Sequence, residues 1–445
     1  MTISGLRMKT QDKLEMREYP LIDCTEKYDS IMVFDKNKNV LVHRWYPFVE
    51  GYSKEFIEDI LSELPTPPTC ALEPFSGSGT TPVELQNHGI RCYSFEVSPF
   101  MHLLAKVKLE RTYDEDTLLR YRNKVADSLA KPVQNIRDVE IIPFGDRVVQ
   151  KDGLKKWNFH DTSLDGLLDI RHAIRTEIDD DRYKNLFTIA LASIILQTSN
   201  LFRNGKCLSY KKGWEKRICK REKVHQLFLE RVDTVITEDI RILSQQDDSV
   251  RNTDICYLGD VRKNIEKVQD NSLDLIITSP PYLNSRDYTD IYMMELRVLQ
   301  LVHSHKDLQA LRKSTIRSHV QVKYSDIEPI ENARLRQCLS DMKKSDAKSW
   351  NTDIHNMICG YFEDMQLLFR AFAKKMRTGG VIYFNVANSA YFGVEVPVDY
   401  IIGDIAESCG FTVREIRKAR DLKTSPQQRG YIKKLRESVL LIDKS

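Results

Sequence analysis

Hydrophobic and polar positions along residues 69–97 predict a strand, a glycine turn, a helix and a second strand in close succession. TCALEPF (69–75) and RCYSFEV (91–97) are short apolar runs typical of buried strands. SGSGTT (76–81) has the composition of a turn, and PVELQNHG (82–89) has the pattern of a helix that ends at a glycine. Two strands joined in this way within about 30 residues begin a parallel sheet.

The segment before this unit predicts a hairpin and a helix. Residues 31–42 contain two strand-like runs, IMVFD and NVLVH, around a Lys-Asn-Lys-Asn turn. Ser53 has the character of a helix N-cap, because apolar residues follow it at helical spacing as far as Leu64. The prolines that begin at Pro65 end this helix.

Further sheet elements follow a long charged segment. Residues 254–259 and 273–278 predict strands, and residues 358–376 predict an amphipathic helix that leads through Thr378-Gly379-Gly380 into the strand VIYFNVAN. A helix over 400–409 and the strands FTVREI and ESVLLID complete the pattern. We therefore predict an α/β fold, in which a Rossmann-like sheet has helices on both faces and is interrupted by two insertions.

The two insertions divide the chain. Residues 110–250 predict a mostly helical insertion whose most apolar stretch is Leu186–Leu196, and residues 303–350 predict a smaller, polar one. The predicted core is then 31–109 together with 251–302 and 351–445.

Composition restricts the compartment and the partners only slightly. The 445 residues include 67 Lys+Arg and 64 Asp+Glu, and a net charge of +3 does not by itself indicate a polyanionic partner. Leu186–Leu196 is shorter than the roughly 20 residues that a membrane span needs, so we expect a cytoplasmic protein without a membrane partner. The nine cysteines form no CxxC pair, and His303 and His305 are two residues apart, so we expect no metal.

The first candidate motif is Glu73-Pro74-Phe75-Ser76-Gly77-Ser78-Gly79-Thr80-Thr81. Its two glycines permit positive-φ turns and allow a ligand to approach the backbone. A phosphate-binding P-loop is disfavoured, because Thr80 stands where that motif requires lysine. Glu96 ends the next strand, where an acidic side chain accepts hydrogen bonds from ribose hydroxyls in nucleotide sites. The alternative is an ordinary turn with a solvated glutamate.

The second candidate motif is TSPPY (278–282), at the end of a buried strand. Pro280 and Pro281 stiffen the backbone and leave its carbonyls free to accept hydrogen bonds. The Ser279 hydroxyl and the Pro280 carbonyl form an acceptor pair suited to an exocyclic amino group, and Tyr282 offers a flat face on which a base can stack. The alternative is a proline turn with a packing tyrosine.

Together the two motifs resemble the amino-directed DNA methyltransferases. EPFSGSGTT resembles motif I of that family (DPFxGxGTT), and TSPPY resembles its catalytic motif IV. Glu96 stands at the acidic position of motif II, Gly259-Asp260 matches motif III, and residues 43–53 resemble motif X. The resemblance covers roughly 200–250 residues and leaves both insertions unmatched.

The resemblance implies S-adenosylmethionine as the methyl donor and a target base flipped out of double-stranded DNA. It places Glu96 at the ribose and Asp260 at the adenine amino group of the cofactor. The implied cofactor-binding residues are Glu73, Phe75, Gly77, Gly79, Thr80, Glu96 and Asp260. The implied catalytic residues are Ser279, Pro280, Pro281 and Tyr282.

Within the resembled family, serine at the first position of motif IV favours cytosine N4 as the methylated atom, whereas aspartate favours adenine N6. Ser279 therefore favours a site-specific cytosine-N4 DNA methyltransferase, which would belong to a restriction-modification system with a possible cognate restriction endonuclease. The alternatives are an adenine-N6 DNA methyltransferase, an RNA amino-methyltransferase and a non-catalytic DNA-binding subunit. The intact motifs disfavour the last.

Basic residues in both insertions are candidates for DNA contact. Residues 203–223 contain nine lysines and arginines beside the aromatic residues Tyr210 and Trp214. Residues 110–250 are expected to supply the main part of target recognition, shared with 303–350, and the protein is expected to associate with the nucleoid through DNA. Solvated helix faces are the alternative. The candidate DNA contacts are Arg203, Lys206, Lys211, Lys212, Arg217, Arg312 and Lys313.

Overall fold

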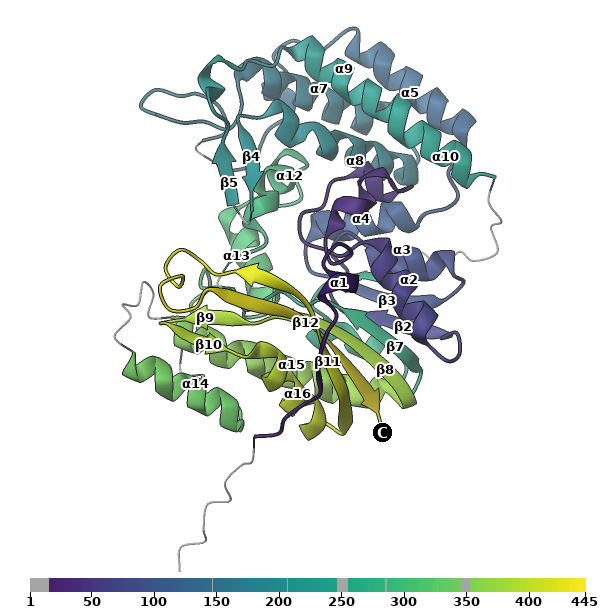
Figure 1. Cartoon of the computed structure of the whole chain (residues 1–445). Helices are drawn as coiled ribbons and strands as arrows, with labels where there is room; N and C mark the ends of the chain where they lie inside the picture. The colour runs from purple at the N-terminus through teal and green to yellow at the C-terminus, as the bar shows by residue number, and fades with distance from the viewer. Residues whose placement is uncertain are drawn as a thin grey trace, which may run out of the picture.

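The computed structural model describes residues 16–445 except 146, 206, 246–254, 285, 326 and 346–352. Within these residues the centre of the protein is an eight-stranded sheet in the order β1-β11-β12-β8-β7-β2-β3-β6 (Figure 1). Strands β6, β3, β2, β7 and β8 are parallel, whereas β12 runs antiparallel between β8 and β11. The strands are β1 (Leu21–Asp23), β2 (Cys70–Glu73), β3 (Arg91–Glu96), β6 (Cys256–Leu258), β7 (Leu273–Thr278), β8 (Met376–Ala387), β11 (Phe411–Lys423) and β12 (Lys434–Lys444).

Helices cover both faces of this sheet. Successive side chains of a strand point to opposite faces, and in the central strands the side chains on both faces are buried. Ala71 and Leu275 pack in a hydrophobic cluster with residues of α2 and α3. Leu72 and Ile276 pack in another cluster, with residues of α15 and α16. The helices around the sheet are α1 (Thr25–Tyr28), α2 (Lys54–Glu63), α3 (Thr80–Asn87), α4 (Pro99–Leu109), α11 (Val261–Asn264), α15 (Ile354–Lys375) and α16 (Val398–Ser408). The predicted α/β architecture with helices on both faces is confirmed.

A helical region follows α4 in the chain, shares one hydrophobic cluster with α4 and lies above the sheet in Figure 1. The predicted apolar stretch 186–196 lies inside α8, and α12 (Met293–Val298) from the later chain packs on the same hydrophobic cluster. The region comprises α5 (Glu115–Leu129), α6 (Ile136–Val139), α7 (Asp161–Glu177), α8 (Asp181–Thr198), β4 (Leu201–Asn204), β5 (Cys207–Tyr210), α9 (Arg221–Arg231), a π-helical turn (Val232–Ile236) and α10 (Thr237–Leu243).

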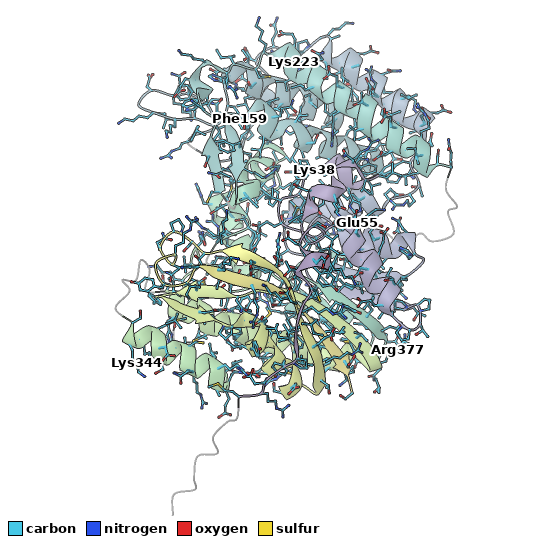
Figure 2. All side chains as sticks on the ribbon, in the orientation of Figure 1. Lys38, Glu55, Phe159, Lys223, Lys344 and Arg377 are labelled. Atoms are coloured by element: carbon cyan, nitrogen blue, oxygen red, sulfur yellow. The ribbon has the colours of Figure 1, made fainter. Side chains whose placement is uncertain are left out.

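The described part of the segment 303–350 contributes two helices, α13 (His305–Ser314) and α14 (Ala333–Lys344). Helix α14 packs against β10 (Val394–Val396), which forms a small antiparallel pair with β9 (Ser389–Tyr391). Lys223 of the helical region and Lys344 of α14 are exposed on the outside of the molecule (Figure 2). In the described part of the chain no helix is long and apolar enough to cross a bilayer.

Residues 31–42 do not form the predicted hairpin. Phe34–Asn39 is instead a 3-10 helix, and a second one, His43–Trp45, follows. Asn37, which was predicted to lie in the turn, is fully buried, and its side-chain amide donates to the Tyr52 carbonyl over 3.2 Å. The local alternation was misleading, because this buried amide ties the segment to the chain just before α2 rather than to a partner strand.

The side chain of Asn37, and not that of Ser53, caps the start of α2. Ser53 stands at the predicted N-cap position, but its hydroxyl donates to the Ile31 carbonyl over 3.1 Å. The Lys54 amide, at the first turn of the helix, donates to Asn37 Oδ1 over 3.0 Å. The start of the helix was therefore predicted correctly, whereas the side chain that satisfies its backbone comes from 17 residues upstream.

The packing of α15 can be tested with adjacent leucines on one helix. Leu368 is 1% exposed and Leu367 is 46% exposed. We expect Leu368→Ala to lower the free energy of unfolding by about 2–5 kcal/mol and Leu367→Ala to change it by less than about 0.5 kcal/mol, measured by urea denaturation. Equal losses for the two variants would contradict the assigned buried face.

Candidate active site

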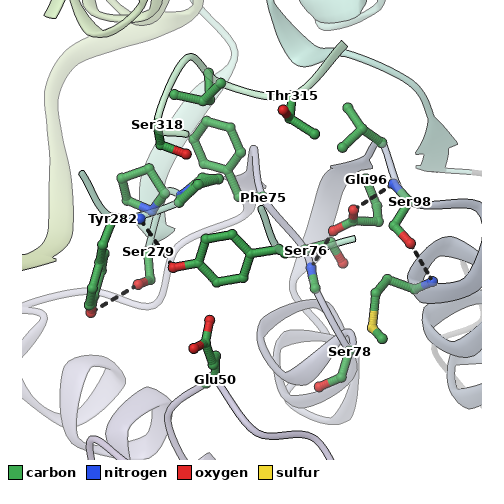
Figure 3. A pocket seen from close by; sticks show the side chains of 18 of the residues that line it. Glu50, Phe75, Ser76, Ser78, Glu96, Ser98, Ser279, Tyr282, Thr315 and Ser318 are labelled. Atoms are coloured by element: carbon green, nitrogen blue, oxygen red, sulfur yellow. Dashed lines mark hydrogen bonds between the residues drawn. The ribbon is translucent and has the colours of Figure 1, made fainter. Parts of the chain in front are cut away.

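The two candidate motifs line one cavity of about 360 Å³ at the carboxyl ends of the parallel strands. Ligands of open α/β sheets bind at this edge. Figure 3 shows the glycine-turn residues on one side of the cavity and the TSPPY residues on the other, with Glu50 reaching in between. The predicted site residues that line it are Phe75, Gly77, Thr80, Glu96, Asp260, Ser279, Pro280, Pro281 and Tyr282.

The glycine turn has the predicted backbone geometry. Gly77 and Gly79 have φ values of +51° and +80°. A side chain at Gly79 would lie 2.9 Å from Cβ of Ala105, so this glycine allows α4 to pack closely against the turn. Gly77 lines the cavity. Gly79 does not line it and lies on the side of the turn that packs against α4.

Glu96 closes the turn and presents a carboxylate to the cavity. Its two oxygens accept the backbone amides of Gly77 and Ser98, each over 2.8 Å. Burial raises the pKa of Glu96 to about 7. Each oxygen keeps a second lone pair, so the carboxylate can also accept from a ligand hydroxyl. The position fits the predicted ribose acceptor.

Glu73 does not line the cavity, which corrects its prediction as a cofactor-binding residue. Its side chain is buried and accepts four hydrogen bonds: from the Thr278 hydroxyl (2.7 Å), the Phe75 amide (2.9 Å), the Tyr52 hydroxyl (2.8 Å) and the Thr81 hydroxyl (3.1 Å). Glu73 therefore joins the glycine turn to the residue that precedes Ser279. Its hydrogen bonds therefore hold the cavity wall in position from the side of the protein core.

Asp260 lines the cavity but is already strongly engaged. It accepts the backbone amide of Arg262 over 2.9 Å and pairs with the guanidinium of the same residue over 2.8 Å. Arg262 also pairs with Asp364, which in turn binds Arg317. Arg262 thus makes four hydrogen bonds to the two oxygens of Asp260 and holds this carboxylate rigidly at the cavity wall.

The TSPPY segment is held by residues that the sequence did not reveal as functional. The Tyr282 hydroxyl donates to Glu437 Oε1 over 2.5 Å and accepts from the Asn385 amide over 2.7 Å. Its backbone amide donates to the Tyr288 hydroxyl over 3.3 Å. The one signal in the sequence was Glu437 itself, a charged residue in phase with Val439 and Leu441 on a buried strand face.

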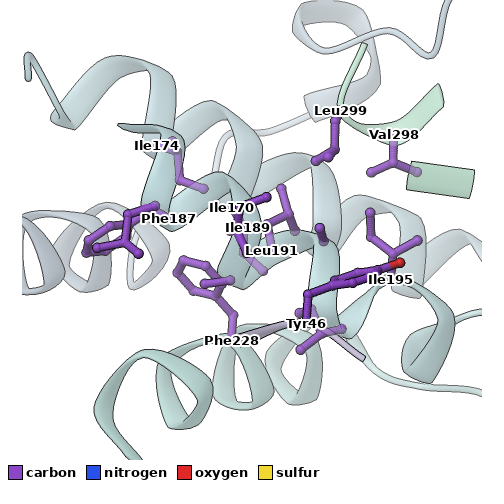
Figure 4. Packing of buried hydrophobic residues seen from close by; sticks show 14 of the residues in the cluster. Tyr46, Ile170, Ile174, Phe187, Ile189, Leu191, Ile195, Phe228, Val298 and Leu299 are labelled. Carbon is purple, nitrogen blue, oxygen red and sulfur yellow. The ribbon is translucent and has the colours of Figure 1, made fainter. Parts of the chain in front are cut away.

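Three of the candidate DNA contacts have internal partners instead. Arg203 pairs with Glu295 over 2.6 Å and lies 4.8 Å from the centre of the Tyr292 ring. It also binds Tyr46, which belongs to the core of the helical region (Figure 4). The structure therefore assigns Arg203 to that core and corrects its predicted role as a phosphate contact.

Lys211 and Arg312 are corrected in the same way. The Lys211 ammonium donates to three carbonyls at the end of α8, and Arg312 pairs with Asp287 over 2.5 Å and with Asp290 over 2.7 Å. Trp214, predicted to lie near DNA, is buried against Trp157. Lys206 lies outside the described residues. The candidates that remain exposed are Lys212, Arg217 and Lys313.

The described residues include no cluster of three or more His, Cys, Asp or Glu side chains that could hold a metal. An S-adenosyl ligand fits the cavity better on chemical grounds. Glu96 and Asp260 supply acceptors for hydroxyl and amino groups, and Phe75, Val97 and Val261 supply apolar walls beside them.

Comparison with known proteins gives matches over nearly the whole chain. The sequence is 25% identical to the type II methyltransferase M.BsoBI of Geobacillus stearothermophilus, over 97% of this chain and 91% of that protein. It is 24% identical to M.AvaI of Nostoc sp. over 93% and 86%, and 27% identical to M.MvaI of Kocuria varians over 56% and 55%. No protein-family model matches the sequence.

Among solved structures, the rRNA methyltransferase AviRa of Streptomyces viridochromogenes aligns with 91% of this chain and 84% of its own at 12% identity. The TM-score of this alignment is 0.25. The sheet, the cavity and the sequence relatives define a Rossmann-like methyltransferase, with S-adenosylmethionine as the implied cofactor. Within this class the chain resembles the type II methyltransferases over nearly its full length.

The raised pKa of Glu73 predicts a dependence of stability on pH. Burial raises this pKa from 4.5 to about 7, so the folded protein holds a proton that the unfolded chain releases. The free energy of unfolding should therefore fall as the pH rises from about 4.5 to 7, by on the order of 3 kcal/mol for this one group. Denaturant titrations across this range should show a shallower fall for Glu73→Gln.

Glu331→Gln is the matched control, because Glu331 is 77% exposed, and this variant should keep the slope of the native protein. An identical slope for Glu73→Gln and the native protein would show that Glu73 ionises in the folded state as readily as in water.

Proposed function

We propose that the protein is a site-specific DNA methyltransferase that modifies the exocyclic N4 amino group of cytosine. The observation that carries this proposal is the convergence of the glycine turn, Glu96 and the SPPY residues on one cavity. An acceptor pair and a flat aromatic side chain thus lie beside a site suited to an adenosyl group. The type II methyltransferases similar to this chain support a DNA substrate.

Different residues of the cavity would bind the cofactor, orient the target amino group and stack on the base. S-adenosylmethionine, when bound, supplies the electrophilic methyl group, and Glu96 and Asp260 would hold its adenosine part. The Ser279 hydroxyl and the Pro280 carbonyl accept hydrogen bonds from the target amino group, which orients the nitrogen lone pair for direct attack. Tyr282 stacks on the base, which must leave the duplex to reach the cavity.

Cytosine N4 is favoured over adenine N6 by Ser279, the first residue of the SPPY segment. Both amino groups need two acceptors and a stacking face, so adenine N6 is the second candidate function. We further propose a role in restriction-modification, with a cognate endonuclease that recognises the same sequence, and hence action on DNA in the cytoplasm. Methylation of RNA is the third candidate.

The test is methyl transfer from labelled S-adenosylmethionine to unmethylated genomic DNA, followed by digestion to nucleosides and mass spectrometry. We expect N4-methylcytosine as the product. N6-methyladenine would retain the methyltransferase and contradict the assignment of the base from Ser279. Product on RNA alone would contradict DNA as the substrate.

We propose that the exposed residues Lys212 and Arg217 contact DNA phosphates and that the helical region carries part of target recognition. Each lost phosphate contact reduces the slope of log affinity against log salt by about 0.9. The double variant Lys212→Ala with Arg217→Ala should therefore lower the magnitude of this slope by about 2, measured by DNA binding between 50 and 200 mM salt.

The matched control replaces Lys343 and Lys344, exposed residues in the last turn of α14. Lys344 lies at the opposite end of the molecule from the helical region (Figure 2), so this variant should keep the slope of the native protein. Equal slopes in all three proteins would mean that Lys212 and Arg217 belong to a solvated face.

A further inference from the structure

A buried polar network lies behind the aromatic face that the proposed function assigns to the target base. Glu437 is 1% exposed and Asn385 is 2% exposed, yet both line the cavity beside Tyr282. The Asn385 amide donates to the Tyr282 hydroxyl over 2.7 Å and to Glu437 Oε1 over 3.1 Å. The same amide lies 3.4 Å from the Ser279 hydroxyl, which itself lies 3.4 Å from the Tyr282 hydroxyl (Figure 3).

Strand register explains how these groups meet. Glu437 of β12 lies directly opposite Arg420 of β11, and the Arg420 guanidinium pairs with Glu437 Oε2 over 2.5 Å. Asn385 of β8 lies opposite Val439, two residues beyond Glu437 on the same face of β12. Glu437 and Asn385 are therefore diagonal neighbours on one sheet face, within reach of each other's polar atoms.

The carboxylate of Glu437 determines which groups of the network donate hydrogen bonds and which accept them. Because a carboxylate only accepts hydrogen bonds, it fixes the Tyr282 hydroxyl as its donor and turns the NH2 group of Asn385 toward itself. Burial, and then the charge of Glu437, raise the pKa of Tyr282 well above its usual value, so the phenol stays protonated and donates. The Asn385 carbonyl oxygen, on the opposite side of the amide, has no partner among the described residues.

We propose that Glu437 is a positioning residue for methyl transfer, which fixes the ring of Tyr282 and the amide of Asn385 beside Ser279. This inference rests on the proposed function. With the hydroxyl held at one end, the ring cannot tilt away from a stacked base, so the target amino group stays aligned with the methyl donor.

A double-mutant cycle separates positioning through the Tyr282 hydroxyl from a general structural role. Glu437→Gln keeps the volume of the side chain but reverses the hydrogen-bond polarity. Arg420 can only donate, so the introduced amide must offer it the oxygen and present its NH2 group to Tyr282 and Asn385. Tyr282→Phe keeps the stacking ring and removes the hydroxyl.

We expect each single substitution to lower kcat for DNA methylation at least tenfold, with the Kd for S-adenosylmethionine changed less than twofold. The double variant should be no slower than the slower single variant by more than about twofold, because both changes break the same interaction. Arg414→Met is the matched control, since it breaks an exposed ion pair with Asp443 between the same two strands. It should keep kcat within twofold.

Three outcomes would overturn the proposal. These are wild-type kcat in Glu437→Gln, wild-type kcat in Tyr282→Phe, or losses that multiply in the double variant. The Tyr282→Phe result decides the question even if the change at Glu437 prevents folding. Failure of the wild-type protein to methylate DNA would instead contradict the proposed function, so the two failures are distinguishable.

Discussion

The buried carboxylate of Glu73 is the interaction on which the active-site edge of the sheet depends. Its two oxygens receive four hydrogen bonds, from Tyr52, Phe75, Thr81 and Thr278. These donors belong to the segment before α2, the glycine turn, α3 and the end of β7. A buried carboxylate is costly unless its lone pairs are satisfied, so this arrangement penalises any displacement of one of these segments relative to the others. Two motifs about 200 residues apart in the sequence therefore share one rigid wall.

The elements around this wall could be predicted because their signals are local. Strand β7 was predicted with its observed bounds, and β2, β3 and the helix between them follow from apolar runs and a glycine turn within one segment. Residues 31–42 were predicted wrongly, because the alternation of apolar residues there is as local as in a hairpin. What decides their structure is the contact of Asn37 with the chain before α2, and no periodicity encodes that contact.

The roles of charged residues depend even more on contacts that are distant in the sequence. Arg203 and Arg312 were candidate phosphate contacts because their sequence neighbours are basic. Their partners Glu295 and Asp287 lie 92 and 25 residues away, and a count of local charge cannot include them. The glycine motif conversely placed Glu73 beside the ligand by its position alone, whereas burial and four donors make it a support. Composition identifies charge, and only tertiary contacts decide whether that charge faces water, a ligand or another side chain.

The order of the strands adds a further constraint on the site. β12 comes last in the chain and lies antiparallel between β8 and β11, so it brings Glu437 to Asn385 on one side and to Arg420 on the other. Tyr282 reaches this carboxylate from the end of β7, two strands away. The glycine turn and Glu96 need only the parallel half of the sheet to take their geometry. The surroundings of Tyr282 need the whole sheet, because the carboxylate that accepts its hydroxyl arrives with the final strand.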